Sequence, residues 1–261
     1  MKAFIFSVHY YILLFFTITI TGSFAQGPPI FTDTPIMLGL EGGAIRTFGK
    51  YFSRDNTKMY VQPLAIPYNI NAHWQAGAVV PFVWVNPEGI SSRSGVGDVM
   101  VFSKYQVLQK DGKGKTFRSL LKLTHTFSTG SADRMPPLGM GTSQTTAGLV
   151  SGYVSTRYGI YTEAAYNFRA GGLPDELIYN VAVGVPLLPQ QYPPKQINIY
   201  LEFNGNLTLE NEINNLFISP GVQWIAGRKL LIEAGIQLPL HEDVAEKTNL
   251  VVLLGTRILL F

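Results

Sequence analysis

The chain has 261 residues, a formal net charge of +3 and no cysteine. The lack of cysteine excludes disulfides, thiolate metal sites and a lipid-modified N-terminal cysteine, and the scattered basic residues argue against nucleic acid as a partner. Charged residues make up 14% of the sequence and aromatic residues 12%, whereas soluble domains carry roughly 25% charged residues. This composition suits a wall that faces lipid, but it also suits a soluble β-sandwich.

Residues 1–25 have the order of a secretory signal peptide. Lys2 precedes an almost wholly apolar run, and Ser23-Phe24-Ala25 forms a small-x-small cleavage site. A transmembrane anchor is the competing interpretation, because the apolar run is nearly long enough to span a membrane. Cleavage after Ala25 is the favoured prediction, and it leaves residues 26–261 as one domain that begins with a short N-terminal lead over 26–35.

After the lead, alternating side chains predict a succession of strands, because a strand has a side-chain period of two. In 196–209, one face carries Ile197, Ile199, Leu201 and Phe203, and the other carries Asn198, Tyr200, Glu202 and Asn204. The predicted strands are 36–50, 58–70, 72–85, 96–110, 115–128, 143–156, 158–170, 175–188, 196–209, 213–226, 229–240 and 247–261. Their polar faces are rich in Asn, Gln and Gly, which suits a wet lumen. The pattern predicts an all-β fold, a closed antiparallel transmembrane β-barrel of about 12 strands, in which closure satisfies every backbone hydrogen bond.

The connections between these strands alternate in length. The longer ones, 51–57, 86–95, 129–142 and 241–246, are predicted to lie at the outer surface, where they would meet lipopolysaccharide. The chain ends in an aromatic residue, Phe261, as expected of a strand that the barrel-assembly machinery recognises. The register of this last strand stays open, because counting back by twos from Phe261 reaches Arg257, whereas the alternate positions are the more apolar.

Ionisable residues on the strands are the candidate functional residues. A Lys or Arg facing lipid near the midplane costs roughly 2–4 kcal/mol, so most of these residues should face inward. They are Asp98, Lys104, Arg118, Lys122, Glu163, Arg169, Glu202 and Glu233. Two interpretations remain open: a paired network that plugs and stiffens the barrel, or a selectivity lining along a water path.

Catalysis and metal binding receive little support. His73, His125 and His241 are the histidines left after cleavage, and no Gly-x-Ser-x-Gly nucleophile elbow is present. The acidic turns near 210–212 and 241–243 offer oxygen ligands that calcium would accept, but hydrated outer loops are the favoured explanation. We therefore predict a protein that is not an enzyme and has no catalytic residue, no metal and no cofactor.

One segment carries a more specific signal. It runs Gly95-Val96-Gly97-Asp98, continues to Lys104-Tyr105, and is followed further on by Thr129-Gly130 and Leu138-Gly139-Met140-Gly141-Thr142. These motifs resemble the outer-membrane family named for the MetA pathway of phenol degradation. The resemblance is sharp over 95–155. It implies a barrel that passes small compounds, hydrophobic or aromatic ones included, across the outer membrane.

The same segment supports a prediction about one side chain. Gly95 and Gly97 permit a tight backbone entry into a strand, and Asp98 then falls on the inward face. We expect Asp98 to have a cationic partner in the lumen, such as Arg118 or Lys122.

Taken together, these features predict a passive outer-membrane channel or transporter for small molecules, with membrane lipid around it and no nucleic acid partner. The alternative is a structural or adhesion barrel with a plugged lumen, whose outer loops, 129–142 above all, bind partners. A membrane-embedded hydrolase is disfavoured because no active site is apparent.

Overall fold

The computed structural model describes residues 27–37, 42–189, 191 and 193–260. The predicted signal peptide over 1–25 and the terminal Phe261 lie outside these residues. The described part contains strands β1 (Gly43–Arg54), β2 (Thr57–Asn71), β3 (Trp74–Pro87), β4 (Arg93–Val96), β5 (Met100–Gly112), β6 (Lys115–Thr126), β7 (Gln144–Ser155), β8 (Gly159–Arg169), β9 (Glu176–Pro186), β10 (Gln196–Thr208), β11 (Ile213–Ile225), β12 (Leu230–Glu242) and β13 (Thr248–Leu260).

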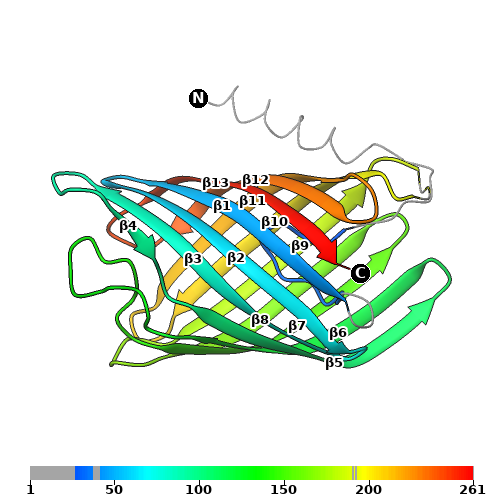
Figure 1. Ribbon diagram of the computed structural model, residues 1–261, viewed down its shortest axis with the longest axis horizontal. Coiled ribbons are helices and arrows are strands. Elements are labelled where there is room, and N and C mark those ends of the chain that lie inside the picture. The colour runs from blue at the N-terminus through cyan, green and yellow to red at the C-terminus, as the bar shows by residue number, and fades with distance from the viewer. Residues whose placement is uncertain (1–26, 38–41, 190, 192, 261) are drawn as a thin grey trace, which may run out of the picture.

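These strands close into an antiparallel barrel (Figure 1). Apart from β4 and β5, each strand pairs with the next. The first strand pairs with the last, from Gly43 opposite Leu260 to Arg54 opposite Thr248. The short β4 and the longer β5 both pair with β3 and share one position in the ring, so the barrel has twelve strands. The prediction of an all-β closed barrel is confirmed, and no described helix is long and apolar enough to span a membrane.

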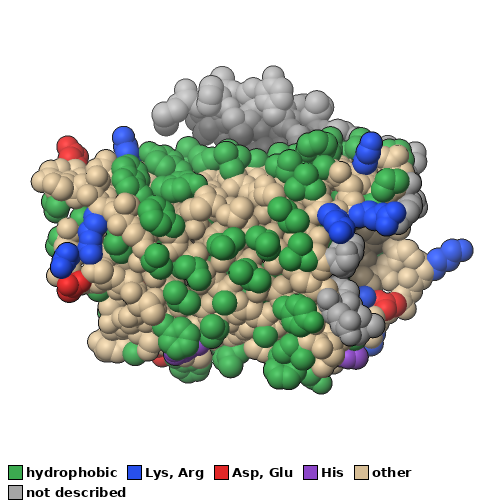
Figure 2. All heavy atoms as spheres, viewed as in Figure 1, with side chains coloured by type: hydrophobic (Ala, Val, Ile, Leu, Met, Phe, Trp, Pro, Cys, Tyr) green, Lys and Arg blue, Asp and Glu red, His purple; other side chains and the backbone are tan. Residues whose placement is uncertain are grey.

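The outer face of the barrel is apolar. Along β10, Leu201 and Phe203 point outward and are exposed, whereas Glu202 between them is 0% exposed. Figure 2 shows apolar side chains scattered over the wall, while Lys, Arg, Asp and Glu lie toward its two ends. An exposed apolar belt between charged ends is the surface that a bilayer covers.

The interior has the opposite character. Glu163, Glu202 and Glu233 are buried there, and so are many Asn, Gln, Ser and Thr side chains. The last strand follows the same division: Leu254 is 64% exposed on the outer face, and Arg257 turns inward to Glu233. The register of the last strand, which the sequence left open, is thereby settled: the more apolar set of alternate positions in β13 faces outward.

The first predicted strand is misplaced. It was expected over 36–50 with an outer loop at 51–57, but β1 runs from Gly43 to Arg54 and pairs with β2 up to Ser53 opposite Lys58. Asp55 and Asn56 alone form the turn. The apolar residues just before β1 imitate strand alternation, yet Ile36 belongs to an irregular segment in which its amide donates to Thr34 Oγ1 at 3.1 Å.

Two ends of the barrel are distinguished below. The terminal end is where β1 begins and β13 ends, and the loop end carries the connections 88–92 and 127–143 (Figure 1).

Candidate functional site

The lumen holds residues 27–37, which we call the plug segment. Gly27 lies against Tyr161, whose hydroxyl donates to the Gly27 carbonyl at 2.9 Å, and Pro35 lies beside Gly152 of the neighbouring strand. Asp33, between these two points, reaches Lys122 on β6, which lies closer to the loop end. The segment therefore enters from the terminal end, advances into the barrel and turns back.

Side chains of the wall bind the carbonyl groups of the plug segment one after another. Tyr200 also donates to Gly27 O. The following carbonyls are bound in order: Pro28 O by Gln223 Nε2 at 2.9 Å, Pro29 O by Arg257 Nη2 at 2.8 Å, and Ile30 O by Arg46 Nη2 at 3.0 Å. Because these donors come from five strands around the ring, they hold the main chain of the plug segment inside the lumen.

Glu202 binds the amide groups that follow. Its carboxylate accepts hydrogen bonds from the backbone N–H of Ile30 at 2.8 Å, of Phe31 at 3.1 Å and of Thr32 at 2.6 Å. Burying a carboxylate without partners is costly, so these amides are what make the full burial of Glu202 tolerable. Conversely, three consecutive plug amides would lack a partner if Glu202 were removed.

Glu233 forms the centre of a second cluster. It lies 2.7 Å from Arg46 Nη2 and 2.8 Å from Arg257 Nη2, and its side chain is fully buried. The two arginines use their remaining N–H groups to reach the plug carbonyls. Glu233 thus keeps two guanidinium groups side by side that would otherwise repel each other.

Asp33 forms the third cluster. Its carboxylate oxygens contact Lys104 Nζ at 2.5 Å and Lys122 Nζ at 2.9 Å. Lys122 also lies 2.9 Å from Glu163 Oε1, and Asn180 donates to Glu163 Oε2 at 2.9 Å. The plug segment is therefore tied to the wall by charge as well as by its main chain.

A small apolar seat completes the binding of the plug segment. Ile30 is buried with Tyr161, Tyr200 and other apolar residues of the inner wall, and Phe31 packs against the same group. The wall makes room with Gly221 and Gly235, which face each other across β11 and β12. A Cβ on Gly221 would lie 2.5 Å from Ile30 Cδ1, and a Cβ on Gly235 would lie 2.6 Å from Phe31 Cε2.

At the loop end, Asp98 interrupts the wall between β4 and β5. Its carboxylate accepts hydrogen bonds from the backbone amides of Gly130 at 2.8 Å and Met140 at 2.7 Å. The prediction of a cationic partner for Asp98 is wrong. No described ion pair includes Asp98, and its carboxylate binds loop amides instead. Asp98 consequently anchors the 127–143 connection and takes no part in the charge network of the lumen.

The other motif residues of this region serve the same anchoring. Leu138 folds back from the loop onto Val83 and Val85 of the inner wall. Gly95 and Gly97 leave space for it, because a Cβ on Gly95 would meet Leu138 at 2.9 Å. Thr129 Oγ1 accepts a hydrogen bond from the Val99 amide at 2.8 Å. The loop therefore covers part of the mouth, a placement that the sequence left undecided.

The structure gathers only part of the predicted set of lumen residues. Lys104, Lys122, Glu163, Glu202 and Glu233 surround the plug segment. The rest of the set lies elsewhere: Arg118 is 3.8 Å from Asp111, Arg169 is 2.9 Å from Glu176, and Asp98 holds the loop. Tyr105, named with the family motif, is exposed on the outer face.

Asp33, Arg46 and Arg257 also belong to the site, although they were not among the predicted residues. Arg46 and Arg257 occupy inward-facing positions in the alternation of their strands, so the period of two along each strand does indicate them. Asp33 lies in a segment without any period, and nothing in its pattern indicates that it enters a lumen.

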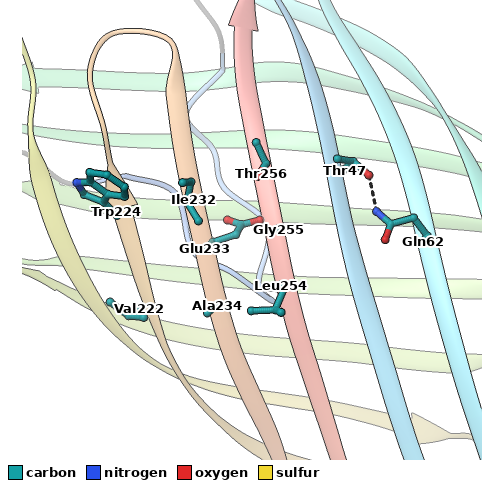
Figure 3. Close-up of a pocket in the computed structure, with 10 residues that line it drawn as sticks. All are labelled: Thr47, Gln62, Val222, Trp224, Ile232, Glu233, Ala234, Leu254, Gly255 and Thr256. Carbon is teal, nitrogen blue, oxygen red and sulfur yellow. Dashed lines mark hydrogen bonds between the residues drawn. The ribbon is translucent and has the colours of Figure 1, made fainter.

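A separate hollow of about 430 Å³ lies on the outer side of the wall (Figure 3). Trp224, Ile232 and Leu254 line it from their outward positions, and Gln62 donates to Thr47 along its rim. Glu233 lies behind it on the lumen side, where residues that precede β1 pass in the figure. This hollow faces outward, whereas the charged clusters face the lumen.

The fold and the charged lumen define a β-barrel of the outer-membrane type. The family described as "Putative MetA-pathway of phenol degradation" matches residues 56–248, and the chain belongs to this family. No curated protein matches the sequence.

Solved structures share the fold at low identity. An outer membrane channel from Pseudomonas putida F1 has a TM-score of 0.66 and 12% identity, over 90% of this chain and 100% of that one. The KdgM porin has a TM-score of 0.51 and 10% identity, over 82% and 98% of the two chains. The β domain of the Bordetella autotransporter BrkA has a TM-score of 0.51 and 13% identity, over 84% and 99%. Proteins of different roles share this barrel, so function has to be argued from the site.

Proposed function

We propose that this protein is an outer-membrane channel for small molecules, hydrophobic or aromatic ones included, and that the plug segment narrows its lumen. In this proposal residues 1–25 direct export and are removed, and the barrel over 26–261 inserts into the outer membrane. The description of its family names phenol degradation, which supports aromatic compounds as a substrate class.

The observation that carries the proposal is the occupant of the lumen. Eight-stranded barrels are filled by side chains of their own wall, and barrels of sixteen or more strands leave an aqueous channel. Here the twelve-stranded barrel encloses a lumen wide enough to hold a separate stretch of polypeptide. The plug segment is bound by hydrogen bonds, ion pairs and a small apolar seat, and none of these is covalent. Release of the segment would leave a polar passage as wide as a peptide chain.

Liposome swelling with purified protein tests this function. Gly235→Leu places a side chain where Phe31 now lies and should expel the plug segment without changing any charge. We expect swelling in a small neutral sugar to be several-fold faster than with the wild type. Ala234→Leu is the matched control, since residue 234 neighbours Gly235 but faces outward, and it should swell like the wild type.

Hydrogen exchange of residues 27–37 shows independently whether the plug segment has left the lumen. If exchange shows that Gly235→Leu has released it and no solute enters the liposomes, the channel function is wrong.

A further inference from the structure

Lys104 and Lys122 occupy an unusual position on the inner wall. They lie directly opposite each other across the β5–β6 pair. Like charges at directly opposed positions of a sheet destabilise it, and both side chains are largely withdrawn from solvent. Such a pair is stable only when an anion lies between the two ammonium groups.

The wall supplies only part of that negative charge. Glu163 contacts Lys122, but its contact with the plug segment is the Asp33 amide at 3.5 Å. The two oxygens of Asp33 complete the site, one on each lysine. The carboxylate comes from the plug segment and not from the wall, so it leaves the lysine pair whenever that segment moves.

We propose that the Lys104–Lys122 pair is a binding site for a small organic carboxylate that passes through the channel, and that Asp33 is a tethered ligand occupying this site. The inference rests on the proposed channel function and names its substrate class as organic anions. A carboxylate that enters from the loop end reaches the lysine pair before the main-chain contacts of the plug segment, because Lys104 lies near the start of β5. Its binding displaces Asp33 and loosens the plug segment.

The charges of the surrounding lumen fit an anionic solute. Arg46, Lys50, Lys104, Lys122 and Arg257 face the plug segment. Two described wall carboxylates, Glu163 and Glu202, contact the plug segment, and Glu233 lies behind its partners Arg46 and Arg257. Once Asp33 has moved away, cationic groups outnumber anionic ones along this stretch, and such a lining favours anions.

Calorimetric titration of the purified full-length protein in detergent, at low chloride, tests the site with benzoate as the probe. Benzamide has nearly the same shape and no charge. We expect Asp33→Asn to bind benzoate at least tenfold more tightly than the wild type, because the tethered competitor is gone. Adding Lys104→Gln should remove that gain, whereas adding Arg118→Gln, on the same face as Lys122 but paired with Asp111, should keep it. Benzamide should bind none of these proteins measurably.

Hydrogen exchange of the wild type gives a second readout that needs no variant. Saturating benzoate should accelerate exchange of the plug amides at residues 30–33, and benzamide should not. Equal benzoate affinity in wild type and Asp33→Asn, or equal binding of benzamide, would overturn the carboxylate site. That result is distinct from failure of the channel function, which is decided by liposome swelling with neutral sugars.

Discussion

Glu202 Oε1 lies 2.8 Å from the backbone amide nitrogen of Ile30, a contact that joins the middle of β10 to a segment that precedes the first strand. The carboxylate serves three successive amides and is fully buried. Because three of its contacts are to main-chain amides and one is to the Thr32 side chain, Glu202 recognises mainly the path of the plug segment.

Replacing Glu202 should therefore loosen the plug segment. In Glu202→Ala, the amides of residues 30–32 lose their acceptor, and we expect their hydrogen exchange to accelerate at least tenfold, as measured by mass spectrometry of the segment 27–37. Glu210→Ala removes the same charge from an exposed turn and should leave exchange unchanged. Protection of these amides in Glu202→Ala equal to the wild type would show that other contacts hold the segment.

Glu233 is expected to matter for stability of the barrel itself. Removing one partner from a buried charge cluster leaves the others uncompensated, at a cost of about 3 kcal/mol. Glu233→Ala leaves Arg46 and Arg257 facing each other, so the free energy of unfolding in lipid vesicles, measured with urea, should fall by that amount. Glu88→Ala, in an exposed loop, serves as the control. A loss below about 1 kcal/mol would mean that water in the lumen solvates both arginines.

Asp98 should control access to the 127–143 connection. Asp98→Ala removes the acceptor for the amides of Gly130 and Met140, so the loop should become more mobile. The bond after Arg134, whose side chain is already exposed, should then fit the trypsin active site more readily. We expect cleavage there to be several-fold faster in the variant, as followed by mass spectrometry. Asp175→Ala releases a different loop and should not change cleavage at Arg134. Unchanged cleavage in Asp98→Ala would assign the anchoring to Arg93, which donates to Arg134 O at 2.9 Å.

The 170–175 connection should respond to acid. The backbone amide of Arg169 and the hydroxyl of Tyr166 both donate to Asp175, at 2.8 and 2.9 Å, and these bonds lower the pKa of Asp175 below its usual value, which is about 3.9. A lowered pKa means that the stabilising contribution is complete above this value and is lost as the pH falls through the pKa of the folded state.

Exchange of the Arg169 amide, corrected for its intrinsic pH dependence, should accordingly stay constant from about pH 7 to pH 5 and rise below about pH 4. Asp175→Asn should abolish this rise. A rise that begins well above pH 5, or one that persists in Asp175→Asn, would contradict the assignment to Asp175.

The strands and their two faces could be predicted from sequence because period-two alternation extends over long runs, as in β8, β10 and β12. A lipid-facing wall needs this alternation at every position, so the signal is strong. The beginning of β1 was misplaced because the short apolar run before it has the same appearance when no partner strand is considered.

The occupant of the lumen could not be predicted. Wall side chains bind the plug segment mainly through its backbone, and backbone contacts impose little pattern on the bound sequence. Asp98 shows the same difficulty. The alternation along a strand predicts which way a carboxylate points, but not whether it binds a lysine or two backbone amides. Both features depend on segments far apart in the chain that meet only in the folded barrel.

The binding site of the plug segment is assembled from Arg46 on β1, Glu233 on β12 and Arg257 on β13, which belong to opposite ends of the chain. These three side chains converge only after the first and last strands have joined. The plug segment precedes every strand in the sequence, yet it can bind this site only after the barrel has closed. Slow or failed closure should be detectable as a population in which strands have formed but the plug segment is not yet bound.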